Sequence, residues 1–228
     1  MNNSICFFIQ NLTDIPTDND WLSPGEKETL SRLRFPKRRK DWLLGRWTAK
    51  CALRGYLGFA SDMDLSLIEI RAAVDGAPEA FLNNAPAGAA VSISHAGNRS
   101  FCAAGSEDMA FGCDIEQLEP RDEIFIADYF VPEEIERVRQ ALPENRTQMT
   151  NLIWSAKESM LKALREGLRR DTRSVLVQPE DGESPNVWNP WRGRCLQSNR
   201  VFYGRWRTLG NFVYTVGSNI TFILEETL

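Results

Sequence analysis

Two carboxylates two residues apart, Asp114 and Glu116, follow an apolar run that begins at Phe111. If this segment is a strand, side chains two residues apart point to the same face. Two carboxylates that face the same way repel each other unless a cation lies between them, and Mg²⁺ binds oxygen ligands of this kind. The pair therefore indicates a magnesium site. By itself the signal is not specific, because acids with the same spacing recur, for example at Asp18 and Asp20.

A second candidate group is the segment from Trp154 to Lys162. Glu158 and Lys162 are four residues apart, so on a helix they share a face and can act on the same ligand. Two structural interpretations compete with this one. Ser155 and Glu158 fit a capping box, and Glu158 with Lys162 fits an ordinary surface ion pair. Taken alone, the residues favour these structural interpretations.

The third candidate is Ser92-Ile93-Ser94-His95, in which a predicted strand ends in a serine and the only histidine of the chain. Hydroxyl and imidazole groups are donors that suit a phosphate. The alternative is a turn histidine without a role. A single histidine excludes zinc sites built on two or three imidazoles, and a Ser-His-Asp triad could use only His95.

A basic stretch from Arg32 to Lys40, followed by Arg46, stands out in a chain whose net charge is −4. It could meet phosphate groups, nucleic acid or an acidic partner, or it could be a solvated helix face. Few aromatic residues are interleaved with it, which weakens the case for binding single-stranded nucleic acid.

The composition is that of a globular protein: 228 residues, 43% of them hydrophobic and 25% charged, enough for one large domain or two small ones. The five cysteines are scattered and include no C-x-x-C pair, which argues against a disulfide framework and favours a reducing cytoplasm. The start of the chain, residues 1–10, has no basic region, so we expect no signal peptide there. No apolar stretch approaches the ~20 residues of a membrane span.

The pattern of apolar residues, caps and breakers predicts a mixed chain. Ser23-Pro24-Gly25-Glu26 predicts a helix start with a capping box. We expect helices at about 23–34, 37–56, 132–141 and 151–168, and strands at about 6–10, 68–73, 89–94, 100–105, 111–116, 201–207, 212–216 and 220–224.

Two of the predicted helices contain similar four-residue segments. Trp47-Thr48-Ala49-Lys50 is similar to Trp154-Ser155-Ala156-Lys157. Four similar residues could arise by chance, or they could mark two related α/β halves that meet near residues 106–110.

Taken together, the order and spacing of these segments resemble a 4′-phosphopantetheinyl transferase of the larger, surfactin-type class. The pair G-x-D-x-E and W-x-x-K-E-x-x-x-K, about forty residues apart, is the specific part of the resemblance. The matching segments are Gly45-Arg46, Ser92 to His95, Phe111 to Glu116, Phe130 to Glu134, and Trp154 to Glu158 with Lys162.

The resemblance implies an α+β fold of two pseudo-symmetric α/β halves, with the active site in the cleft between them. Residues 1–108 would form an N-terminal half that contributes to coenzyme A binding. Residues 109–228 would form a C-terminal half with the magnesium ligands and the catalytic helix. A chain of this class would be a cytoplasmic monomer that binds neither nucleic acid nor a membrane.

The resemblance also implies a reaction, the transfer of 4′-phosphopantetheine from coenzyme A to a serine of an apo acyl or peptidyl carrier protein with release of 3′,5′-ADP. Asp114, Glu116 and Glu158 would hold Mg²⁺ with the pyrophosphate, and Glu158 would also be the general base. Lys162 would stabilise or protonate the leaving group.

Coenzyme A would be held by Arg39, Arg46, Ser94 and His95, in addition to Asp114 and Lys162 of the catalytic group. The chain departs from the family pattern at three positions. Ala77 stands where a lysine is common, Ala96 follows His95 in place of a serine, and Arg165 replaces a glycine after the catalytic helix. These departures concern substrate affinity more than the type of reaction.

Two alternatives stay open. One is a protein of the same fold that binds coenzyme A or a carrier protein without efficient transfer. The other is a nucleic-acid-binding module that uses the stretch from Arg32 to Lys40. The second alternative leaves Asp114, Glu116 and Glu158 unexplained, because a cluster of acids repels phosphate in the absence of a metal.

Overall fold

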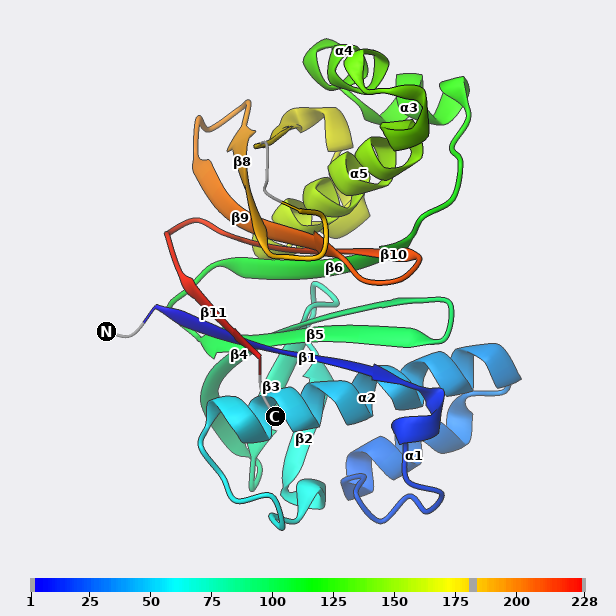
Figure 1. Ribbon diagram of the computed structural model, residues 1–228. Coiled ribbons are helices and arrows are strands. Elements are labelled where there is room, and N and C mark those ends of the chain that lie inside the picture. Colours follow the sequence, from blue (N-terminus) through cyan, green and yellow to red (C-terminus); the bar gives the residue numbers. More distant parts are fainter. Residues whose placement is uncertain (1–2, 181–183, 227–228) are drawn as a thin grey trace. The chain divides into compact units, whose positions relative to one another are not determined.

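The computed structural model describes residues 3–180 and 184–226 (Figure 1). Contacts within the chain divide it into two compact units. The first unit comprises residues 1–109 together with 222–228, and the second comprises residues 110–221. Each unit has its own sheet and its own long helix, so the chain has the α+β class expected from its sequence.

The first unit contains a six-stranded sheet in the order β11-β1-β5-β4-β3-β2. Only the pair of β1 and β11 is parallel among the described strands of this sheet. Helix α2 packs on β1, β4 and β5. The elements are β1 (Ser4–Asn11), α1 (Pro24–Arg32), α2 (Pro36–Tyr56), β2 (Ile68–Ala72), β3 (Pro78–Leu82), β4 (Ala85–Ala96), β5 (Arg99–Ser106) and β11 (Ile223–Glu226), with short 3-10 turns η1 (Leu12–Asp14) and η2 (Leu65–Leu67).

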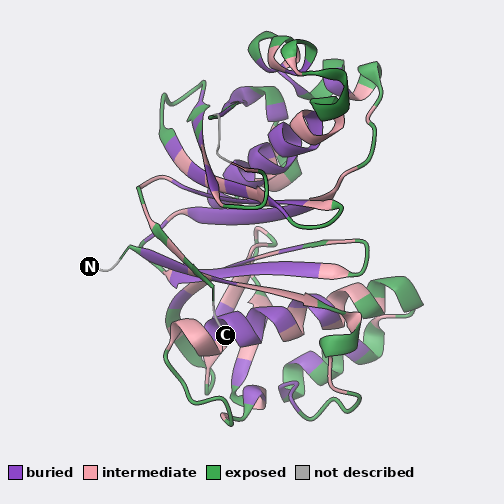
Figure 2. Cartoon of the chain, in the orientation of Figure 1, coloured by how far each residue is buried: buried purple, intermediate pink, exposed green. Residues whose placement is uncertain are grey.

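The second unit contains an antiparallel five-stranded sheet in the order β6-β10-β9-β8-β7. Helix α5 packs along β6 and β10, and Figure 2 shows that most of this helix is buried. The elements are β6 (Phe111–Gln117), α3 (Glu123–Tyr129), α4 (Pro132–Gln140), α5 (Arg146–Ala163), β7 (Val175–Pro179), β8 (Asn189–Cys195), β9 (Val201–Thr208) and β10 (Phe212–Ser218), with 3-10 turns η3 (Pro143–Asn145), η4 (Gly167–Arg169) and η5 (Thr172–Ser174).

A buried ion pair joins the helices of the first unit. The ammonium of Lys50, on α2, lies 2.5 Å from a carboxylate oxygen of Glu26, and both side chains are almost fully buried. Glu26 is the third residue of α1 and caps that helix, as its sequence predicted, while its other oxygen accepts the backbone N–H of Ile70. Lys50 also donates to the carbonyls of Trp21 and Leu65. One ion pair therefore ties two helices, a 3-10 turn and a strand together.

The second unit contains an equivalent ion pair. Lys157 of α5 lies 2.7 Å from Glu134, the third residue of α4, with both side chains inaccessible to solvent. Glu134 accepts the backbone N–H of Val177 on β7 at 2.8 Å. Lys157 donates to the carbonyls of Thr172 and Val175 at 2.9 and 2.7 Å. The similar segments Trp47 to Lys50 and Trp154 to Lys157 therefore occupy equivalent positions in the two units.

Several predicted elements differ from those observed. The last long helix begins at Arg146 and not near 151, because the 3-10 turn η3 leads directly into it. It ends at Ala163, since Arg165 and Gly167 adopt positive φ angles of 58° and 53°. Strands β3, β7 and β8 and helix α3 were not predicted. The final strand, β11, pairs with β1 of the first unit, whereas we expected residues 109–228 to form one C-terminal half.

Two expectations about the whole chain can also be compared with the structure. None of the five cysteines, all of which lie in the described ranges, forms a disulfide. Among the described helices, none combines the length and the apolar character that crossing a membrane requires.

The buried ion pair of the second unit can be tested by substitution. Replacing Lys157 by Met leaves the Glu134 carboxylate buried without its counter-charge, so we expect a loss of about 3–5 kcal/mol in the free energy of unfolding, measured by urea denaturation. The double variant Lys157→Met/Glu134→Gln should lose less than the sum of the two single variants. As a control, Arg173→Met breaks the exposed pair with Asp171 and should unfold at the wild-type urea concentration. A Lys157→Met midpoint equal to that of the control would contradict the stabilising role.

Candidate functional site

The second unit brings four of the predicted site residues together. Asp114 and Glu116 lie on β6, while Glu158 and Lys162 lie on α5. The Lys162 ammonium is 2.7 Å from an oxygen of Asp114 and 3.9 Å from one of Glu158, and it also donates to the carbonyl of Cys113 at 3.1 Å. The predicted pairing of Glu158 with Lys162 on one helix face is thus confirmed, but the pair is mostly buried and is not a surface pair.

The glycine of the G-x-D-x-E motif sets how closely β6 approaches α5. A Cβ atom at Gly112 would lie 2.2 Å from the carbonyl oxygen of Ser159 and 2.8 Å from Cβ of Lys162. Any side chain there would push the strand from the helix. Because Gly112 and Asp114 are two residues apart, the same close approach brings the Asp114 carboxylate to Lys162.

The alternative reading of Ser155 as a helix cap is wrong. Ser155 lies in the middle of α5, where its hydroxyl is 2.8 Å from the hydroxyl of Thr215 on β10. Ser159, one turn later, donates its hydroxyl to the carbonyl oxygen of Thr215 at 3.1 Å. These two serines anchor α5 to the sheet and leave Glu158 on the neighbouring face of the helix.

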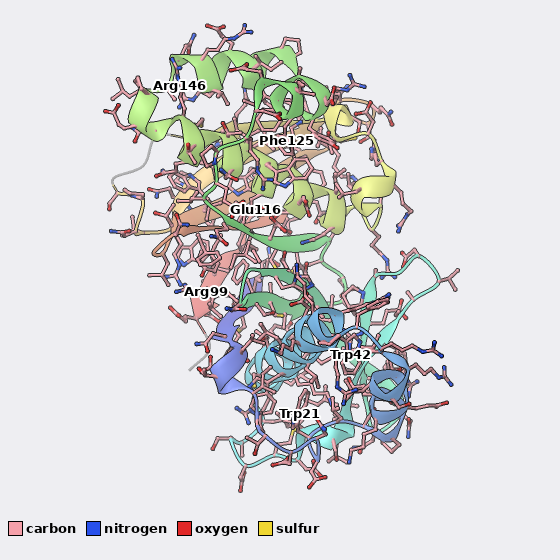
Figure 3. All side chains as sticks on the ribbon, turned by 90° about the vertical axis from the view of Figure 1, so that its right-hand side faces the viewer. Trp21, Trp42, Arg99, Glu116, Phe125 and Arg146 are labelled. Atoms are coloured by element: carbon pink, nitrogen blue, oxygen red, sulfur yellow. The ribbon has the colours of Figure 1, made fainter. Side chains whose placement is uncertain are left out.

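Glu116 is held by two residues that the sequence analysis did not single out for this purpose. One carboxylate oxygen accepts the indole N–H of Trp154 at 3.0 Å, and the other accepts a guanidinium N–H of Arg121 at 2.9 Å. Asn151 in turn accepts from Arg121 and donates to the carbonyl of Glu119. Figure 3 labels Glu116 on β6 and shows the side chains around it. Trp154 belonged to the motif, but nothing in the spacing of Arg121 could have revealed its contact.

Burial and mutual repulsion shape the protonation of this site. Burial, and secondly the charge of Asp114, raise the pKa of Glu116 to about 7 and that of Glu158 to about 8. Burial opposes the charge on Lys162, but the carboxylates of Asp114 and Glu158 outweigh it and raise the Lys162 pKa above its ordinary value. Near neutral pH Glu116 and Glu158 are therefore partly protonated, which lowers the repulsion among the three carboxyl groups.

The donor chemistry fits magnesium, although the carboxylates are not gathered as a ligand set. Within residues 3–180 and 184–226, no three His, Cys, Asp or Glu side chains are grouped as metal ligands. Lys162 instead contacts Asp114 and lies near Glu158, while Arg121 pairs with Glu116. The side-chain donors of Asp114, Glu116 and Glu158 are carboxylate oxygens, which Mg²⁺ prefers, and a divalent cation would offset the burial and the repulsion that raise the pKa values of Glu116 and Glu158.

A cavity of about 340 Å³ opens beside Trp154 in the same unit. Its wall includes Phe125 and Tyr129, whose ring centroids lie 5.0 and 5.1 Å from that of Trp154. Arg170 and Thr172 contribute polar atoms to the lining. Trp154 therefore contacts the Glu116 carboxylate through its N–H and the cavity through its ring.

The first unit places the other predicted residues on α2 and β4. Gly45 lets α2 approach β4, since a Cβ there would lie 3.3 Å from the side chain of Ile93. The segment Gly45-Arg46 thus packs against the strand that carries Ser94 and His95. Ser94 is buried near the end of β4, whereas His95 is exposed.

The two predicted arginines of α2 make contacts within the first unit. The Arg46 guanidinium lies 5.0 Å from the ring centroid of Trp42 and 3.9 Å from Glu26, and burial lowers its pKa. Arg39 donates to the carbonyl of Leu30 at 2.8 Å. Both side chains are partly engaged in holding α1 against α2, and their role toward a ligand stays a prediction.

A family model matches part of the chain. Residues 110–212, which contain both signature motifs, match the model of the 4′-phosphopantetheinyl transferase superfamily. Over this segment the chain is therefore similar to the superfamily. It is 28% identical over 151 residues to the 4′-phosphopantetheinyl transferase HetI of Nostoc sp. (strain PCC 7120), a match that covers 65% of this chain and 62% of HetI. The similarity thus spans less than two thirds of that relative.

Solved structures of holo-(acyl-carrier-protein) synthases are also similar. The synthase of Bacillus anthracis, in complex with CoA (3′,5′-ADP), is 21% identical, with a TM-score of 0.39 over 45% of this chain and 93% of its own. The synthase of Thermotoga maritima is 19% identical, with a TM-score of 0.37 over 57% and 76% of the two chains. The Helicobacter pylori synthase in complex with coenzyme A is 17% identical, with a TM-score of 0.30 over 45% and 99%.

The close approach of β6 and α5 leads to a prediction about Gly112. In Gly112→Ala the new methyl group meets helix backbone that cannot move alone, so we expect a loss of about 1–3 kcal/mol in stability, measured by urea denaturation. A suitable control is Gly25→Ala, whose Cβ would meet only the terminal carboxylate of Glu69. We expect the control to be close to neutral. Equal stability of the two variants would show that the approach of β6 to α5 is not constrained at Gly112.

Proposed function

We propose that this protein transfers the 4′-phosphopantetheine group of coenzyme A to a serine of an apo acyl or peptidyl carrier protein and releases 3′,5′-ADP. The observation that carries the proposal is the meeting of Asp114, Glu116, Glu158 and Lys162 in one site. That site lies within residues 110–212, the region that matches the 4′-phosphopantetheinyl transferase superfamily.

The reaction requires a base, a stabilised leaving group and neutralised phosphoryl charge. The serine oxygen forms a bond to the β-phosphorus of coenzyme A, while the bond from that phosphorus to the bridging oxygen breaks. Glu158 accepts the serine proton, a role that suits a carboxyl group whose pKa is raised to about 8. Lys162, kept charged by Asp114, compensates the charge on the departing 3′,5′-ADP or protonates it.

Asp114, Glu116 and Glu158 are the residues that would hold Mg²⁺ together with the pyrophosphate. The ion would supply charge neutralisation at the phosphoryl group under attack. The role of Arg121 and Trp154 is to orient Glu116, since both of its oxygens are hydrogen-bonded. This orientation would present the carboxylate toward Asp114 and away from solvent.

Coenzyme A would be bound by the first unit through Arg39, Arg46, Ser94 and His95, whose groups suit phosphates. At Ala77 no cationic side chain is present, and its backbone N–H donates to Asp75. The cavity beside Trp154 combines an aromatic wall with the charged side chains of Asp128, Arg169, Arg170 and Asp171, which would suit a chain that carries both apolar and hydrogen-bonding groups, as the pantetheine arm does.

The decisive experiment is the intact mass of a purified apo carrier protein after incubation with this protein, coenzyme A and Mg²⁺, with EDTA as control. We expect a gain of about 340 Da, the mass of phosphopantetheine, that depends on the metal. No gain with acyl, polyketide and peptide carriers would reject transfer. Calorimetric binding of coenzyme A would then distinguish a binding protein of the same fold from a protein with another function.

The assigned base can be tested in the same assay. Glu158→Gln removes a proton acceptor and a metal ligand while conserving shape, so turnover should fall at least ~100-fold. The matched control is Glu144→Gln, an exposed residue of η3, which should retain wild-type turnover. Near-normal turnover of Glu158→Gln would exclude the assigned role.

The raised carboxyl pKa values predict how metal binding depends on pH. In the metal-free protein Glu116 and Glu158 have pKa values of about 7 and about 8, so both are partly protonated near neutrality. A cation favours the ionised forms, so Mg²⁺ binding should release protons near neutral pH and its apparent affinity should increase as the pH rises through these values. Calorimetry in buffers of different ionisation enthalpy measures the release. Binding without proton release at neutral pH would show that these carboxyls are not the ligands.

A further inference from the structure

The last part of the second unit has an unusual charge. From Ser184 to Thr221 the sequence contains five arginines and no aspartate, glutamate or lysine, in a chain with a net charge of −4. The motifs of the transferase site lie outside this segment, and the proposed reaction uses none of its residues. The arginines are Arg192, Arg194, Arg200, Arg205 and Arg207.

Four of these arginines share one face of the sheet. On β8 and β9 they alternate with buried residues, and the buried residues face α5, since a Cβ at Gly193 would lie 2.3 Å from the sulfur of Met160. The arginines therefore point away from α5. We call this surface the arginine face and define it by Arg192, Arg194, Arg205 and Arg207; Arg200 lies exposed in the turn between the two strands.

The arginine face has little compensating charge within the described part of the chain. Arg192 pairs with Glu180 at 2.9 Å, but its side chain is still 63% exposed. Among the residues at 3–180 and 184–226, no acid contacts the guanidinium groups of Arg194 or Arg205. No two of these arginines stand directly opposite each other, since Arg192 faces Tyr203 and Arg194 faces Val201 across the two strands. The hydrophobic core on the other side of the strands is completed by Trp191 and Phe202.

Arginine is also the side chain that suits recognition of anions on a surface. Its planar guanidinium binds a carboxylate through two parallel hydrogen bonds and is more weakly hydrated than an ammonium. At the end of the same strands, Leu196 and Val201 are exposed apolar residues. Apolar groups bordered by charged ones are typical of a protein interface.

We propose that the arginine face is a docking surface for an acidic protein surface, which in the proposed function is that of the carrier domain. The identity of the partner rests on the proposed function, whereas the charge and position of the surface do not. Through its arginines the surface steers the carrier and fixes its orientation, while the chemistry is performed by Glu158 and Lys162.

The state of the aromatic rings favours an acidic protein over nucleic acid. The aromatic rings on this side of the sheet are already covered by the protein's own arginines. Arg192 lies 5.8 Å from the ring centroid of Tyr203, and Arg207 lies 4.7 Å from that of Trp188. These rings do not present the open stacking platforms that single-stranded nucleic acids use.

The test uses the full-length protein and an apo carrier whose acceptor serine is replaced by alanine, so that binding is measured without transfer. We expect Arg192→Gln/Arg194→Gln to weaken binding about tenfold and to reduce its salt dependence. With an unmodified carrier, the same variant should raise the KM for the carrier by a similar factor and leave kcat unchanged. Arg205→Gln provides a second, independent variant on the other strand.

The matched control is Arg139→Gln/Arg146→Gln, which removes two exposed arginines of the same unit on the side of the sheet covered by helices. It changes the net charge equally and should leave binding and KM at wild-type values. Thermal unfolding of all variants checks that each is folded.

Three results would overturn the proposal. The first is a carrier affinity unchanged in both arginine-face variants while the wild-type protein transfers normally. The second is a loss of affinity confined to Lys37→Gln/Arg38→Gln in the basic stretch of the first unit. The third is tighter binding of a labelled single-stranded oligonucleotide than of the carrier at physiological salt, abolished in Arg192→Gln/Arg194→Gln. Absence of transfer by the wild type would instead reject the proposed function, so the two failures are distinguishable.

Discussion

A lysine ammonium buried under a long helix is the constraint on which each unit of this protein depends. Lys50 and Lys157 are both fully inaccessible to solvent, and burial lowers the pKa of each. A charge in that position is tolerated only with a counter-charge and with its remaining N–H groups satisfied. Glu26 and Glu134 supply the counter-charge, and two backbone carbonyls accept from each lysine. The start of one helix, the middle of another and a strand are thereby held in one arrangement.

The proposed catalytic group of Asp114, Glu116, Glu158 and Lys162 depends on this arrangement in the second unit. Because Lys157 points into the core, the next residue, Glu158, is turned to the adjacent face of α5, and Lys162 follows one turn later on that face. Gly112 lets β6 come close enough for Asp114 to reach Lys162. The packing thus forces several carboxylates into one poorly solvated place. In the proposed function, a cation bound with the pyrophosphate would offset the cost of their burial and repulsion.

Local patterns in the sequence predicted part of the fold and much of the candidate site. The cap at Ser23 and Glu26, the strand that carries Asp114 and Glu116, and the common helix face of Glu158 and Lys162 all follow from spacings within one element. The contacts that were missed join residues far apart in the chain. Trp154 and Glu116 are an example, and so are Ser155 and Thr215, whose contact shows that Ser155 does not cap a helix. The start of α5 was misplaced because no cap marks it; the 3-10 turn before it continues into the helix. The spacing of residues in the sequence indicates which side chains share a face of one helix or strand, but it does not indicate which helices and strands pack against each other.

The pairing of β11 with β1 gives the chain a nested order. The chain leaves the first unit after Met109 and returns to it at Phe222, and the two ends of the second unit are joined by a hydrogen bond from the Asn219 N–H to the Ala110 carbonyl. The second unit is therefore an insertion into the first and not a tail that follows it. A fragment that starts at residue 110 and runs to the end of the chain would carry a strand without its sheet, and its complement would expose the unpaired edge of β1. To isolate the first unit with its sheet intact, residues 110–221 would be deleted and residue 109 joined to residue 222.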